Sequence, residues 1–148
     1  MANWNFSTRG NIKTHVKQNV SENEYILHRE VFNLSKKYNC LNVPKILEYK
    51  NKIMTTVRIE SLNVADLYGE DDVPVDVFNN IREIIQTLYD SGIIYPDITG
   101  YNFIETQCRG KSKIWVFDFE HAEYMPNQPN NFVEKFLSGE NFWNPYFK

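Results

Sequence analysis

Residues 91–124 read SGIIYPDITGYNFIETQCRGKSKIWVFDFEHAEY, and the rest of the chain can be interpreted around them. The pattern predicts a short apolar run, a loop that carries Asp97 and Asn102, and a hairpin of two short strands that ends at Asp118. Three oxygen-bearing side chains are therefore expected at the ends of buried strands. Carboxylate and amide oxygens are hard ligands, which suits a divalent cation and a phosphate. A carboxylate that the metal does not need is free to orient or deprotonate a nucleophile.

Two motifs in this stretch carry a resemblance to a known family. The segment YPDITGYN at residues 95–102 resembles the protein-kinase catalytic loop H-R-D-x-x-x-x-N, and DFE at residues 118–120 resembles D-F-G. The spacing from Asp97 to Asn102 matches that loop. Apolar residues after Asn102 and before Asp118 fall where the family has two flanking strands.

Other positions depart from the family pattern. Tyr95 and Pro96 stand in place of the loop His and Arg, Thr99 in place of a common Lys, and Glu120 in place of the glycine of D-F-G. No glycine-rich G-x-G-x-x-G lies upstream of Lys13, and no A-P-E motif is found. The chain therefore resembles a kinase reduced to its centre, similar to small atypical serine/threonine kinases and to viral kinase-like proteins.

The resemblance implies an α+β fold, a reduced protein-kinase-like fold with a single domain over residues 1–148. Residues 1–60 would form a reduced N-lobe, a small antiparallel sheet with one helix. Residues 61–124 would form a truncated, mostly helical C-lobe with the catalytic-loop hairpin, followed by an aromatic C-terminal tail at 125–148.

The composition sets limits on other functions. The chain has 148 residues with 42% hydrophobic and 15% aromatic content, which is enough for a folded domain with a core. A net charge of −3 without a basic run gives no reason to expect nucleic-acid binding. Two cysteines suggest free thiols in a reducing compartment, and no apolar stretch approaches membrane-spanning length. The expected location is cytoplasmic, meaning the host cytoplasm or the virion if the protein is viral.

A helix is predicted to begin at Ser21, whose capping box pairs it with Glu24, and to run to about Tyr38. Its apolar stripe at helical spacing consists of Ile26, Leu27, Val31, Leu34 and Tyr38. Glu30 falls on the same stripe, so it needs a partner if buried; alternatively it lies at the stripe edge and reaches water. By the resemblance, Glu30 would pair with a strand lysine that grips the phosphates. Lys13, inside the alternating segment 12–16, is favoured for this role, with Lys17 as its rival.

A second hairpin is predicted from residues 45–49 and 53–59, turned at residues 50–52. By the resemblance, this segment matches the strands and hinge that link kinase lobes. Thr56 would then lie at the back of the nucleotide pocket, and the backbone from Val57 to Ile59 would face the adenine edge. An ordinary antiparallel edge is the alternative.

The longest helix is predicted from Asp72, its expected cap, to Ser91-Gly92, with an apolar stripe that belongs to the core. Phe132 to Leu137 is expected to form a short helix. The aromatic end, Phe142 to Phe147, either covers the core or forms a surface for a protein partner.

Three interpretations remain open. The first is a minimal kinase that transfers a phosphoryl group from ATP with Mg²⁺ to a protein or small-molecule hydroxyl. By the resemblance, Asp97 is its base, Asn102 and Asp118 hold the metal, and Lys13 with Glu30 places the phosphates. The second is an inactive pseudokinase that acts as a binding or structural subunit. The third is a small α+β domain in which the motifs are coincidental.

Overall fold

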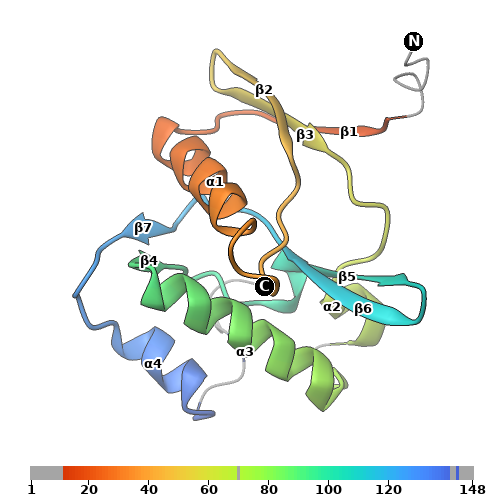
Figure 1. The fold of residues 1–148 in the computed structure, drawn as a ribbon, viewed down its shortest axis with the longest axis vertical. Helices are drawn as coiled ribbons and strands as arrows, with labels where there is room; N and C mark the ends of the chain where they lie inside the picture. The colour runs from red at the N-terminus through yellow and green to blue at the C-terminus, as the bar shows by residue number, and fades with distance from the viewer. Residues whose placement is uncertain (1–11, 70, 141–142, 144–148) are drawn as a thin grey trace.

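The computed structural model describes residues 12–69, 71–140 and 143. Most of the aromatic end lies outside these residues. A three-stranded sheet with one long helix forms one half of the molecule, and helices with two small two-stranded sheets form the other half (Figure 1). The predicted α+β fold with small antiparallel sheets is confirmed.

The first half is built on an antiparallel sheet in the order β1-β3-β2. Its strands are β1 (Thr14–Lys17), β2 (Ile46–Lys50) and β3 (Ile53–Val57). The hairpin of β2 and β3 occurs where it was predicted, and positive φ at Asn51 and Lys52 allows the tight turn. Strand β1 extends to Lys17, which lies opposite the buried Met54 of β3.

Helix α1 (Glu22–Leu34) packs beside this sheet (Figure 1). Its cap is Ser21, whose side chain accepts from the backbone N–H of Glu24, as the capping box predicts. The helix ends before the predicted Tyr38 because residues 35–37 form a turn. The buried face is also different from the predicted stripe, because Ile26 and Glu30 are exposed. The buried side chains of α1 are those of Glu24, Leu27, His28 and Val31.

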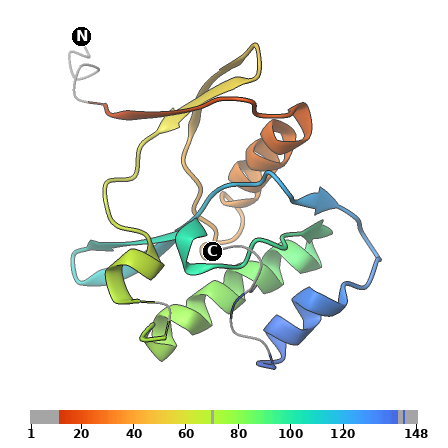
Figure 2. The ribbon, with the colours of Figure 1, turned by 180° about the vertical axis from the view of Figure 1, so that it is seen from behind.

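The second half contains the remaining elements, seen from both sides in Figures 1 and 2. In chain order they are α2 (Val64–Tyr68), α3 (Val75–Asp90), β4 (Ile93–Ile94), the 3₁₀ turn η2 (Gly100–Asn102), β5 (Phe103–Cys108), β6 (Lys111–Val116), β7 (Glu123–Tyr124) and α4 (Asn131–Leu137). The hairpin of β5 and β6 and the short helix α4 confirm the predicted elements. Strand β7 pairs with β4. This pairing was not predicted, and it returns the chain to the segment before Asp97.

Helix α3 supplies much of the core, as its apolar periodicity predicts. The expected cap at Asp72 is wrong. The N-cap is Pro74, which makes no side-chain hydrogen bond, and Asp72 lies two residues before this cap position. Ser91 closes the helix, followed by Gly92 at a φ of 86°, which a residue with a side chain rarely adopts. The side chains that α3 buries are Val77, Phe78, Ile81, Ile84, Ile85 and Leu88.

Within the aromatic end, the structure describes Trp143. Its ring lies 4.5 Å from that of Phe78 in α3. Phe136 of α4 stacks on the same Phe78 ring at 5.9 Å. Trp143 is therefore packed against the core, while the expected partner surface in the tail remains a prediction. Across the described parts of the chain, no helix combines the length and the apolar character needed to span a membrane.

Candidate functional site

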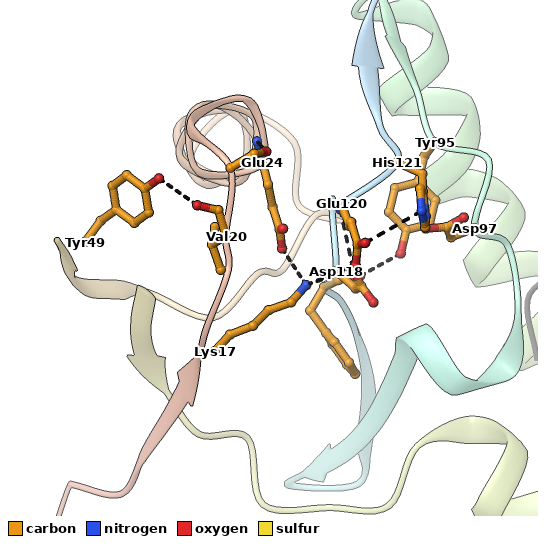
Figure 3. Close-up of polar contacts among 11 residues, drawn as sticks. Lys17, Val20, Glu24, Tyr49, Tyr95, Asp97, Asp118, Glu120 and His121 are labelled. Atoms are coloured by element: carbon orange, nitrogen blue, oxygen red, sulfur yellow. Dashed lines mark hydrogen bonds and ion pairs between the residues drawn. The ribbon is translucent and has the colours of Figure 1, made fainter. Parts of the chain in front are cut away.

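Lys17, at the end of β1, lies among carboxylates from two distant parts of the chain (Figure 3). Its Nζ donates to Glu24 Oε2 at 2.7 Å and to Asp118 Oδ1 at 3.1 Å. A third carboxylate oxygen, from Glu120, lies 3.9 Å away. Glu24 is only 2% exposed and Lys17 is 28% exposed, so the ammonium group joins a buried acid of α1 to the loop after β6.

The expected pair of Lys13 and Glu30 is wrong. Lys13 precedes β1 and forms an exposed ion pair with Glu60 at 3.1 Å. Glu30 lies on the exposed face of α1 because Glu24, His28 and Val31 define the buried face. The rival lysine, Lys17, is the one that pairs with an acid of this helix.

A cavity of about 350 Å³ opens beside Lys17. Its walls come from the sheet, from α1 and from the loop at Asp118. Met54 and Thr56 are buried at its wall, as is His28 of α1. The cavity therefore combines a largely apolar lining with the cations Lys17 and Arg58 and the acids Glu24 and Asp118.

Thr56, Val57 and Ile59 all line this cavity. The resemblance to the kinase hinge places the same three residues at a nucleotide pocket, a role that stays a prediction. The backbone N–H of Val57 already donates to Lys45 O at 2.9 Å. The N–H of Arg58 likewise donates to Lys13 O at 2.9 Å. These two donors are therefore occupied by backbone contacts. The Ile59 carbonyl accepts from the Ser61 N–H at 3.2 Å, so the N–H of Ile59 is the candidate for an edge-on contact with a base.

Asp97 follows β4 in a loop that is held by hydrogen bonds at both ends. Asn102 Nδ2 donates to the backbone oxygen of Asp97 at 2.9 Å. The hydroxyl group of Tyr95 donates to Phe117 O at 2.6 Å, which ties this loop to the residue before Asp118. Tyr95, which replaces the His of the kinase motif, thus acts through a hydrogen bond as well as through packing.

Asn102 and Asp118 lie at the same end of the β5–β6 hairpin. Phe103 is opposite Val116 in the register, and Phe117 N donates to Asn102 O at 3.3 Å. Asp118 has a φ of 67°, in the left-handed region, and its Oδ1 also accepts from the Glu120 N–H at 3.3 Å. Such backbone conformations are costly and cluster at functional sites.

These two side chains fit a magnesium ion by their chemistry. The Asn102 amide nitrogen is committed to a carbonyl, which leaves its oxygen as an acceptor, and Asp118 supplies a half-exposed carboxylate. Magnesium binds through one or two protein oxygens together with phosphate and water. Among residues 12–69, 71–140 and 143, no group of three or more His, Cys, Asp or Glu side chains could hold a metal. A metal here would therefore depend on phosphate oxygens.

Aromatic rings connect α1 to the loop of Asp97. Phe119 is fully buried, and its ring meets that of His28 edge-on at 5.4 Å and that of Tyr95 at 5.5 Å. His28 Nε2 in turn donates to Pro44 O at 2.7 Å. Phe119 therefore fixes the position of Asp118, its neighbour in the chain, against both halves of the molecule.

His121 was not identified from the sequence. Its Nδ1 donates to Asp97 Oδ2 at 2.7 Å, and its Nε2 lies 3.7 Å from Glu120 Oε2 (Figure 3). The sequence feature that could have indicated His121 is its position three residues after Asp118, in the turn that leads into β7. Glu24 was also missed as the lysine's partner because the capping box assigned its carboxylate to the helix end.

Burial and ion pairing shift the pKa values of these groups. Burial opposes the charge on Lys17, but its hydrogen bonds with Glu24 and Asp118 outweigh that effect and raise its pKa. Burial raises the pKa of Glu24, and Lys17 offsets only part of the rise. The pKa of Asp97 is likewise raised by burial, whereas its contact raises the pKa of His121. A carboxyl group with a raised pKa is a better proton acceptor than an ordinary one.

Comparisons with known proteins bear on the fold. No family model matches the sequence, and no curated protein matches it. The structure is similar to that of Rio2 kinase from Chaetomium thermophilum, solved as an ADP/Mg²⁺-phosphoaspartate complex, with a TM-score of 0.61 and 14% identity. The match covers 78% of this chain and 35% of that one, so this chain spans about a third of the Rio2 chain. The fold is therefore kinase-like.

Proposed function

We propose that this protein is a minimal kinase-like enzyme that binds ATP with Mg²⁺ and transfers a phosphoryl group to the hydroxyl group of a protein or a small molecule. The observation that carries the proposal is the position of Lys17, held between Glu24 and Asp118 at the edge of an apolar cavity. A fixed cation beside a largely apolar pocket suits a nucleotide, whose base is apolar on both faces and whose phosphates are anionic. The Rio2 structure supports the proposal, since its ligand is ADP with Mg²⁺.

Each residue has a distinct role in this proposal. Lys17 contacts the phosphates, and Glu24 holds its ammonium group in place. Asn102 and Asp118 would hold Mg²⁺, which supplies positive charge to the phosphate oxygens. Asp97 orients the acceptor hydroxyl and takes its proton, while the hydroxyl oxygen forms the new bond to the γ-phosphorus and ADP leaves. Positioning and charge neutralisation supply most of the catalysis in such reactions.

A second function remains a candidate, namely a binding or structural subunit that keeps the kinase-like fold without catalysis. The observation that favours it is the burial of Asp97, which is 4% exposed beneath His121 and is closed to an acceptor in this state. As a subunit, the protein would bind a protein partner through its aromatic C-terminal end.

Thermal unfolding with and without ATP and Mg²⁺ tests the proposal. A ligand at a hundredfold over its Kd adds about 2.7 kcal/mol to stability, or roughly 5 to 10 °C for a domain of this size. The shift should disappear with EDTA and in Asp118→Asn but persist in Asp71→Asn, an exposed acid outside the site. No shift in the unchanged protein at millimolar ATP contradicts nucleotide binding and favours the subunit.

Turnover then separates the two functions. Asp97→Asn is expected to keep the nucleotide-dependent shift and to lose release of ADP. A variant that still turns over at the original rate removes Asp97 from the proposed role.

A further inference from the structure

Asp97 is enclosed in this structure, and His121 lies between it and the solvent. The carboxylate side chain is 4% exposed, whereas the imidazole bonded to it is 47% exposed. The bond between His121 Nδ1 and Asp97 Oδ2 is 2.7 Å long (Figure 3). An acceptor hydroxyl group that reaches Oδ2 would have to occupy the place of this N–H.

The second carboxylate oxygen is also informative. Asp97 Oδ1 is buried and has no hydrogen-bond partner among the described residues. Buried polar atoms normally have a hydrogen-bond partner, and a buried polar atom without one lowers the stability of the fold. With no donor on Oδ1 among the described residues, the carboxylate depends on the bond from His121 to Oδ2 for its position.

The backbone around His121 is fixed on both sides. Phe119 is fully buried, and the Ala122 N–H donates to its carbonyl at 3.2 Å. Ala122 O accepts from Asn23 Nδ2 of α1 at 3.1 Å, and the chain then enters β7, which pairs with β4. Because the backbone is anchored, opening the site would require only rotation of the imidazole.

The groups that face His121 favour the closed position. Asp97 accepts from one ring nitrogen and Glu120 lies 3.7 Å from the other, while Asp118 adds negative potential nearby. These three groups, all from the described part of the chain, are acids. The ring is therefore held over Asp97 by its hydrogen bond and by charge.

We propose that His121 is a positioning residue that caps Asp97: it holds the carboxylate through Oδ2, excludes water, and rotates away when an acceptor hydroxyl takes over its hydrogen bond. The proposal rests on the proposed function, because it assigns Asp97 to the acceptor side of that site. It explains how a small kinase-like protein limits the loss of ATP to water. Water is excluded from the base until an acceptor is present.

Carboxyl labelling tests the cap without any nucleotide. The protein is treated with a carbodiimide and glycine ethyl ester, and the labelling rate of Asp97 is measured by peptide mass spectrometry. His121→Ala is expected to raise this rate at least fivefold. His121→Asn places an amide nitrogen near the position of Nδ1 and is expected to stay within twofold of the unchanged protein. Asp118, which is 35% exposed, is the internal reference.

The result that overturns the cap is an Asp97 labelling rate in His121→Ala within twofold of the unchanged protein. Equal acceleration in Ala and Asn variants also overturns it, because the hydrogen bond then has no role. If His121→Ala melts early or changes the labelling of Asp118, then His121→Gln, with no donor near the Nδ1 position, replaces it in the comparison.

Release of ADP with Mg–ATP and water as the acceptor then connects the cap to the reaction. His121→Ala is expected to raise kcat for hydrolysis at least threefold with an unchanged KM for ATP, and His121→Asn to restore the original rate. Faster labelling with no hydrolysis in any variant would refute the proposed phosphoryl transfer and leave the cap standing. Unchanged labelling of Asp97 with active hydrolysis would refute the cap and leave the proposed phosphoryl transfer standing.

Discussion

Replacing Tyr95 with Phe removes one hydroxyl group and keeps the ring. That hydroxyl group donates to the Phe117 carbonyl at 2.6 Å in a fully buried position. The contact of the ring with Phe119 is unchanged in shape, so packing is preserved. The substitution therefore isolates the one bond that joins the loop of Asp97 to the residue before Asp118.

The magnitude follows from the burial of the Tyr95 hydroxyl group against a partly buried carbonyl. A neutral hydrogen bond contributes about 0.5–1.5 kcal/mol, and a buried carbonyl left without its donor costs about 1–3 kcal/mol. We therefore expect Tyr95→Phe to lower the free energy of unfolding by about 1.5 kcal/mol. Unfolding entropy of about 2.1 cal/mol/K per residue gives roughly 0.3 kcal/mol/K for 148 residues. The expected fall in Tm is about 5 °C.

Urea denaturation and calorimetry measure this effect. The matched control is Tyr101→Phe in η2, where the side chain is exposed and the change should be within about 0.5 kcal/mol. The dependence of the free energy on urea should be the same in both variants. An equal and small loss in the two variants would refute the reasoning, because the hydroxyl of Tyr95 would then contribute nothing.

Three further predictions use other parts of the chain. Lys17→Met should weaken binding of Mg–ATP about tenfold or more in a calorimetric titration, because a charge-assisted contact with the phosphates is lost. The control Lys13→Met should change the Kd less than about twofold; equal effects of the two variants would contradict the placement of the phosphates beside Lys17. Burial lowers the pKa of His28, so its contribution to stability is present above the unfolded pKa of about 6.5 and is lost as the pH falls through the folded pKa. His28→Gln should flatten the dependence of the unfolding free energy on pH between about 7 and 5, and an unchanged slope would exclude this cause. Gly92→Ala should cost about 2–3 kcal/mol in urea denaturation and Gly110→Ala about 1 kcal/mol, because both have positive φ but only the Cβ added at Gly92 meets an atom at 2.9 Å; equal costs would contradict the steric argument.

Much of the fold could be predicted because its signals are local. The hairpins of β2–β3 and β5–β6, the apolar face of α3 and the short helix α4 each depend on residues within one element or one turn. The helix cap at Ser21 is also local, since its bond spans three residues. The segment from Asp97 to Asn102 could be located for the same reason, as its hydrogen bond closes a short loop.

The errors share a cause that is not local. Whether Glu24 or Glu30 is buried depends on the rotational phase of α1, which packing against the rest of the fold sets. Lys13 and Lys17 share one face of the strand, so the choice between them depends on where each lies along β3: Lys17 is opposite Met54, whereas Lys13 precedes the paired residues. Propensity and periodicity do not determine either choice.

The sequence by itself therefore determined the two hairpins, the helices α1, α3 and α4, and the loop that carries Asp97, because hydrogen bonds and periodicity within short segments decide these. The tertiary structure decided the pairs. Lys17 meets Asp118 across 101 residues, and His121 meets Asp97 across 24. Such contacts form only when the core has fixed the strands and helices relative to one another, since the free energy that aligns them comes from burial of apolar surface throughout the fold.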